Sequence, residues 1–120
     1  MAFAYRRYEG TVSTTDATKT VGLSVTQADA TVTHVVAVVV GRKSDGTQGF
    51  SAELHGTFRR AGAVTTQIGT TTAVHMKSDD AAWTAGYNVS AAAFTVEVTG
   101  NVGDSVAWRV WVITYEDPSI

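Results

Sequence analysis

The sequence contains no cysteine and a single proline, Pro118, and leucine occurs only at Leu23 and Leu54. Without cysteine the chain can form neither a disulfide framework nor a thiolate metal site, so cysteine usage does not assign its redox compartment. No apolar run approaches the roughly 20 residues that a membrane-spanning helix needs. The formal net charge of −2 lacks the basic excess that is typical of nucleic-acid-binding proteins. We therefore expect no membrane partner and no nucleic acid partner.

Threonine and valine dominate what is present. Both are branched at Cβ, which restricts χ1 and suits a pleated strand better than a helix. Glycines are scattered along the chain as turn residues, and a length of 120 residues suits one domain. These features predict an all-β fold, an antiparallel β-sandwich of jelly-roll-like form. Residues 1–120 would form the single domain, with residues 1–20 as an N-terminal arm or loop.

Residues 31–43 carry the strongest strand pattern of the first half, and both faces of this strand are apolar. Successive side chains of a strand point to opposite faces. One face holds Val36 and Val38, which we assign to the core, and the other holds Val35 and Val39. The pattern alone does not explain why a second apolar face is needed.

Apolar and polar residues alternate more clearly in the next segments. Residues 43–49 predict a hairpin turn, because the Asp45-Gly46 pair tolerates positive φ. Residues 49–60 then predict a half-buried strand, and residues 64–77 a threonine-rich strand with a bulge at Gly69. Residues 94–99 and 105–116 predict the final hairpin. The apolar sides of these strands complete the predicted core: Phe50, Leu54, Phe58, Val96, Val98, Val106, Trp108 and Val110.

The last strand also carries large side chains on the side away from Trp108. An exposed stripe of this kind is rare on soluble monomers, and its residue types are those enriched at protein interfaces. We therefore predict a subunit interface formed by Arg109, Trp111, Ile113 and Tyr115. Two alternatives remain open at this point: a loop of the same chain covers the stripe, or the aromatic side chains form a platform for stacking sugars.

Catalytic and metal-binding motifs are missing. The three histidines, His34, His55 and His75, lie in different predicted strands without the local spacing of a metal site, although neighbouring strands could bring two of them together. No serine lies in a nucleophile elbow. We expect no enzyme activity, no metal and no cofactor.

Two basic pairs stand out, Arg6-Arg7 and Arg59-Arg60. Charged side chains at the edges of sheets discourage unwanted pairing, so these arginines predict solvated edges. Contact with an acidic partner surface is the alternative.

Three short motifs lie in the second half of the chain. They are an acidic loop ending at Trp83, a V-x-V-T-G strand end at residues 96–100, and a G-x-x-V-x-W strand at residues 103–108. Upstream, residues 39–63 contain a hairpin followed by a strand that ends in F-R-R. Over residues 32–114 this pattern resembles a small β-domain of tailed-bacteriophage virion proteins, which occurs on decoration subunits, fibres and spikes, commonly as homotrimers.

The resemblance implies a structural protein of the virion, on the exterior of a bacteriophage particle. It implies a capsid decoration (cement) subunit in the first place, or a tail or fibre appendage subunit. Expected partners are further copies of the chain, as a homotrimer, and other virion proteins such as the major capsid protein or a tail protein. The alternative is a receptor-binding module that recognises a host-surface glycan.

Overall fold

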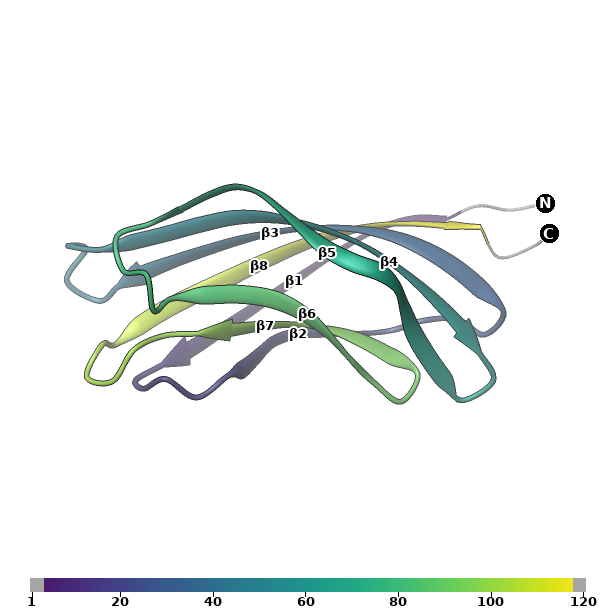
Figure 1. The fold of residues 1–120 in the computed structure, drawn as a ribbon, viewed down its shortest axis with the longest axis horizontal. Coiled ribbons are helices and arrows are strands. Elements are labelled where there is room, and N and C mark those ends of the chain that lie inside the picture. The colour runs from purple at the N-terminus through teal and green to yellow at the C-terminus, as the bar shows by residue number, and fades with distance from the viewer. Residues whose placement is uncertain (1–3, 118–120) are drawn as a thin grey trace.

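The protein is described by a computed structural model that covers residues 4–117. Its strands form two antiparallel sheets, ordered β1-β8-β3-β4-β5 and β2-β7-β6 (Figure 1). We call these the larger and the smaller sheet. The predicted all-β antiparallel sandwich is confirmed. The strands are β1 (Ala4–Thr14), β2 (Thr20–Thr26), β3 (Thr31–Lys43), β4 (Gly49–Ala61), β5 (Val64–Ser78), β6 (Thr84–Ser90), β7 (Ala93–Thr99) and β8 (Val106–Asp117).

The chain order explains how the two layers are connected. Strands β3, β4 and β5 follow one another in the larger sheet, and the chain then passes through β6 and β7 of the smaller sheet. It returns as β8, which lies between β1 and β3. The final hairpin predicted for residues 94–99 and 105–116 is therefore wrong, because β7 and β8 belong to different sheets. Three consecutive strands and a fourth that returns beside the first make a Greek key. The division into five and three strands does not confirm a jelly roll. No helix long and apolar enough to cross a membrane occurs within residues 4–117.

The N-terminal segment differs from the prediction. The sequence predicts an arm or loop over residues 1–20, but residues 4–14 form strand β1, which pairs with β8 from Ala4 to Thr14. Thr11 and Ser13 in this segment are polar because their side chains lie on the solvent-exposed face of the larger sheet, away from the core. Long-range pairing with β8 therefore overrides the weak local pattern.

The turns and bulges follow the glycine positions. Gly46 has a φ of 76° in the turn between β3 and β4, and Gly69 has a φ of 72° within β5. The pairing of β4 with β5 shifts register between His55 and Thr57, opposite the stretch that contains Gly69. The predicted tight turn and the predicted bulge are therefore both present.

The core lies between the two sheets. Most of the residues that the sequence places there are buried: Phe50, Leu54, Phe58, Val96, Val98, Val106, Trp108 and Val110. Two residues of the resemblance motif meet in this core, since the rings of Trp83 and Trp108 lie 5.9 Å apart in an edge-on arrangement. Trp108 is fixed further by its indole N–H, which donates to Thr14 Oγ1 at 2.9 Å.

The assignment of Val36 and Val38 to the core is wrong. Val38 is 39% exposed and Val36 is half-buried, whereas Val35, Ala37 and Val39 are completely buried. In strand β3, Ala37 lies opposite both Val112 of β8 and Leu54 of β4. Because directly opposed residues of an antiparallel pair share a face, the buried sides of β8 and β4 decide which side of β3 is buried.

Candidate functional site

The outer faces of the two sheets differ in chemistry. The outer face of the smaller sheet carries mostly polar side chains, with Val21 as an exposed exception. There the Asn88 side-chain amide lies 3.4 Å from Glu97 Oε1 as a hydrogen-bond donor. The larger sheet instead presents large apolar side chains to solvent on the side away from the core. This contrast singles out one surface of the sandwich as a candidate for binding.

Exposed aromatic and aliphatic side chains form a patch across β1, β8 and β3 of the larger sheet. Val36 lies opposite Ile113, and Val38 lies opposite Trp111. Tyr5 and Tyr115 extend the patch at one end, with their rings 5.4 Å apart. Trp111 is 37% exposed and Tyr115 is 47% exposed. We call this patch the outer apolar face and define it as Tyr5, Val36, Val38, Trp111, Ile113 and Tyr115.

The structure places each residue of the predicted interface on this side of β8. Trp111, Ile113 and Tyr115 belong to the outer apolar face, and Arg109 is an exposed neighbour at its border. The exposure of Trp111 and Tyr115 means that no loop within residues 4–117 covers the stripe. Val36 and Val38 also belong to this surface. The sequence did not predict this, because the side of β3 that carries them was assigned to the core.

Charged side chains from β1 border the outer apolar face. Arg7 pairs in register with Ile113, and Glu9 pairs with Trp111. The Arg109 guanidinium lies 5.8 Å from the centre of the Trp111 ring and 3.9 Å from Glu9 Oε1. The first distance is within the range of a cation–π contact. Trp111 is therefore held between a cation, a carboxylate and the valines of β3.

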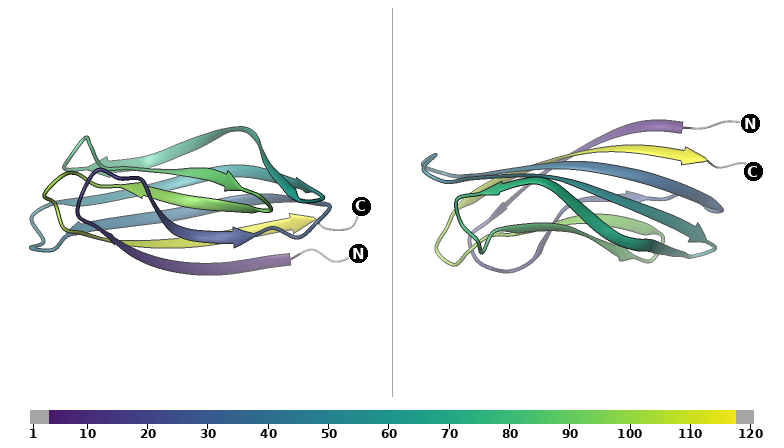
Figure 2. Two further views of the ribbon diagram at one scale, coloured as in Figure 1. Left: turned by 90° about the horizontal axis from the view of Figure 1, so that it is seen from below. Right: turned by 45° about the horizontal axis from the view of Figure 1, so that its top comes forward.

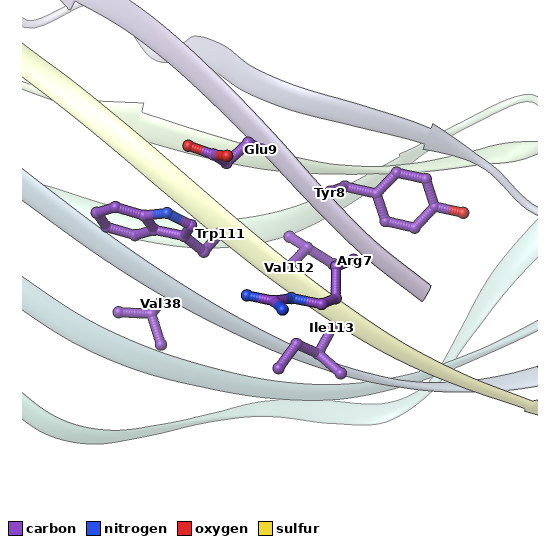
Figure 3. A pocket seen from close by; sticks show the side chains of 7 residues that line it. All are labelled: Arg7, Tyr8, Glu9, Val38, Trp111, Val112 and Ile113. Atoms are coloured by element: carbon purple, nitrogen blue, oxygen red, sulfur yellow. The ribbon is translucent and has the colours of Figure 1, made fainter. Parts of the chain in front are cut away.

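A shallow hollow lies within this arrangement. It has a volume of about 380 Å³, and Arg7, Glu9, Val38, Trp111 and Ile113 contribute to its lining. Figure 3 shows that Arg7 extends from β1 across β8, while Tyr8 points away from these side chains. The hollow thus combines one aromatic ring, aliphatic side chains and a pair of opposite charges.

Two histidines lie beside the patch on β3 and β4. The ring centres of His34 and His55 are 6.1 Å apart, and His34 lies 6.2 Å from the Tyr115 ring. His55 Nε2 is 2.8 Å from Glu53 Oε1. Strand pairing therefore brings two of the three histidines together, as the sequence left open. Within residues 4–117, no group of three or more histidine, cysteine, aspartate or glutamate side chains is placed to hold a metal ion.

The most strongly shifted titratable group lies in the core instead. The Tyr87 hydroxyl donates to the carbonyl oxygen of Leu54 at 2.8 Å, and burial raises the pKa of this hydroxyl well above its usual value. The ring also packs edge-on against Phe58, with ring centres 5.3 Å apart. Tyr87 is therefore a structural residue that ties the smaller sheet to the larger one.

Comparison with known proteins gives structural neighbours only. No protein-family model matches the sequence, and no curated protein is significantly similar to it. The tailspike protein of Acinetobacter phage vB_ApiP_P1 aligns with a TM-score of 0.44 and 14% identity, over 96% of this chain and 22% of that protein. The tailspike protein of Acinetobacter baumannii phage AM24 aligns with a TM-score of 0.37 and 9% identity, over 95% of this chain and 26% of that protein. The chain therefore spans about a quarter or less of these tailspike proteins.

Proposed function

We propose that this protein is a structural subunit on the exterior of a bacteriophage particle, and that it assembles through the outer apolar face. The observation that carries the proposal is the exposed patch on β1, β8 and β3, which contains Trp111 and Tyr115. Burying apolar surface is worth about 25 cal/mol per Å², and contiguous apolar patches on soluble proteins mark interaction sites.

The simplest cover for this face is another copy of the chain. A closed cyclic assembly repeats the same contact around its axis, and the resemblance to the virion domain favours a homotrimer. Trp111, Ile113 and Tyr115 would lie at the subunit contact, with Arg109 at its polar rim. This arrangement accounts for a strand that is apolar on both faces, since one face serves the core and the other serves the assembly.

Light scattering coupled to size-exclusion chromatography tests the assembly. Wild-type protein should elute as a trimer or a multiple of three chains. Trp111→Glu places a charge in the contact and should abolish threefold assembly, leaving species no larger than a dimer, or aggregates, that retain the fold by circular dichroism. Arg59→Glu is the control, because it introduces a glutamate at an exposed position of β4 outside the outer apolar face. A wild-type monomer at all concentrations would refute the interface.

The position on the particle is a separate part of the proposal. A capsid decoration (cement) subunit is the first choice and a tail or fibre appendage the second, with the major capsid protein or a tail protein as neighbour. The support is the motif resemblance over residues 32–114. A low-resolution cryo-EM map of the intact particle with this subunit placed separates the two positions. A particle that lacks the subunit would overturn both.

Host-surface glycan binding is the second candidate, and the hollow beside Trp111 is the observation that favours it. Sugar sites need an aromatic surface with polar groups close by, and here Arg7 and Glu9 supply both signs of charge. A glycan-binding module should show saturable quenching of tryptophan fluorescence by host polysaccharide, and Trp111→Ala should abolish it. A decoration subunit should bind assembled capsids and give no such quenching.

A further inference from the structure

The larger sheet ends in two edge strands that differ in regularity. Strand β5 is interrupted twice, because its pairing with β4 shifts register at two places and Gly69 and His75 have positive φ. Such bulges twist an edge away from further pairing. Strand β1, in contrast, pairs with β8 from Ala4 to Thr14 without any register shift. It contains no proline and has no residue with positive φ.

Strand β1 is an edge strand of the larger sheet. Figure 2 shows β1 running along one margin of the larger sheet, with β8 as its neighbour. Strand β2 approaches β1 from the core side, where a Cβ at Gly10 would meet the carbonyl oxygen of Gly22. The edge itself keeps backbone N–H and C=O groups that no strand of residues 4–117 pairs with. A regular edge of this kind can accept an added strand.

The charges on β1 are ordered so that the strand complements itself. We infer that β1 pairs antiparallel with β1 of a second copy, with Tyr8 opposite Tyr8 at the twofold axis. In this register Arg7 of each copy lies opposite Glu9 of the other, so two pairs of opposite charge form across the contact once both side chains turn from β8 toward the free edge. Arg6 lies opposite Gly10, which has no side chain to repel it. Opposite charges at directly opposed positions stabilise a pair of strands.

The neighbouring registers are disfavoured by the same charges. A twofold axis perpendicular to the sheet keeps the outer faces of both copies on one side, which permits only shifts of the centre by whole residues. A centre at Arg7 places Arg7 opposite Arg7, and a centre at Glu9 places Glu9 opposite Glu9. Like charges directly opposed are destabilising. The charges that would protect an isolated edge therefore select one register of self-pairing.

This contact is separate from the proposed assembly through the outer apolar face, and it joins the larger sheets of two copies edge to edge. Both outer apolar faces then lie on the same side of the joined sheet. Together with a threefold contact, the twofold contact joins trimers to one another, and it closes them into a hexamer where the two axes intersect at right angles. Without the threefold contact, it predicts a dimer.

The self-complementary order permits a charge-swap experiment. In a Val38→Asp background, which removes the outer apolar face from assembly, sedimentation velocity should show a concentration-dependent dimer. Adding either Arg7→Glu or Glu9→Arg places like charges opposite each other and should weaken dimerisation on the order of tenfold. Adding both substitutions together restores opposite charges at both pairs and should restore the dimer. Arg59→Glu in the same background is the charge-matched control and should leave the dimer intact.

The outcomes separate this contact from the proposed function. Dimers of the Val38→Asp protein that are lost in both single reversals and regained in the double swap support β1 pairing, whether or not wild-type protein forms trimers. A Val38→Asp protein that stays monomeric at its highest soluble concentration overturns it. A double-swap protein whose dimer is as weak as those of the single-reversal proteins also overturns it. Circular dichroism checks that each variant retains its strands.

Discussion

Gly41 lies directly beneath the indole of Trp108. The two residues are opposite each other in the pairing of β3 with β8, and a Cβ added at Gly41 would lie 2.7 Å from Cε3 and Cζ3 of the ring. The absence of a side chain on β3 at this point is what allows the largest core residue of β8 to lie flat against the sheet.

Gly41→Ala should therefore destabilise the protein by about 1–3 kcal/mol, because the ring or the strand must move to make room. Chemical denaturation measures the change. Gly86→Ala is the matched control, since no atom lies within 4 Å of a Cβ at that position. Equal stability of the two variants would mean that the Trp108 ring does not pack on Gly41.

The hydrogen bond between Trp108 and Thr14 connects the last strand to the first. Thr14→Val keeps the shape of the side chain but removes the acceptor, and the buried indole N–H then lacks a partner. An unsatisfied buried donor costs about 1–3 kcal/mol. Thr14→Ser retains the hydroxyl and should recover most of the loss. Urea denaturation of the three proteins checks the prediction, and a Val variant as stable as the Ser variant would contradict it.

Neighbouring valines of β3 should respond oppositely to a charge. Val39 is completely buried and Val38 is exposed on the outer apolar face. Val39→Asp buries an unpaired carboxylate and should prevent folding, since such a group costs several kcal/mol at least. Val38→Asp should fold and lose only its assembly through the outer apolar face. Circular dichroism and light scattering on both variants distinguish the outcomes. A folded Val39→Asp protein would reverse the assignment of the two faces.

Alkaline pH should weaken the protein through Tyr87. Burial raises the pKa of this hydroxyl in the folded protein, whereas in the unfolded chain it titrates near pH 10. The stabilisation is therefore complete below about pH 10 and falls as the pH rises above it, by about 1.4 kcal/mol per pH unit.

Tyr87→Phe should cost about 1 kcal/mol at neutral pH through the lost hydrogen bond, and the variant should lose less stability than wild type above about pH 10. Tyr5→Phe is the control for the loss of a tyrosine hydroxyl, because the Tyr5 side chain is 55% exposed. Urea denaturation at neutral and alkaline pH measures the effect. An unchanged difference between wild type and Tyr87→Phe across that range would contradict the role of Tyr87.

Some features could be predicted from the sequence because local chemistry is decisive. Threonine and valine content predicted the all-β class, and Gly46 and Gly69 marked a turn and a bulge where their positive φ is now seen. On β8 the side that faces the core was also predictable, since Arg109 on one side is charged and Val110 on the other is not. This alternation placed Trp108 in the core and Trp111 on the surface.

Tertiary structure decided the features that depend on strand pairing. On β3 both faces are apolar, so periodicity could not choose between Val38 and Val39. The choice came from the register with β8 and β4, in which the small residues Ala37 and Gly41 share the core side with Trp108. The approach of His34 to His55 and the edge position of β1 are likewise products of pairing. A sequence pattern reports which side chains share a strand face, whereas only the neighbouring strands determine what that face meets.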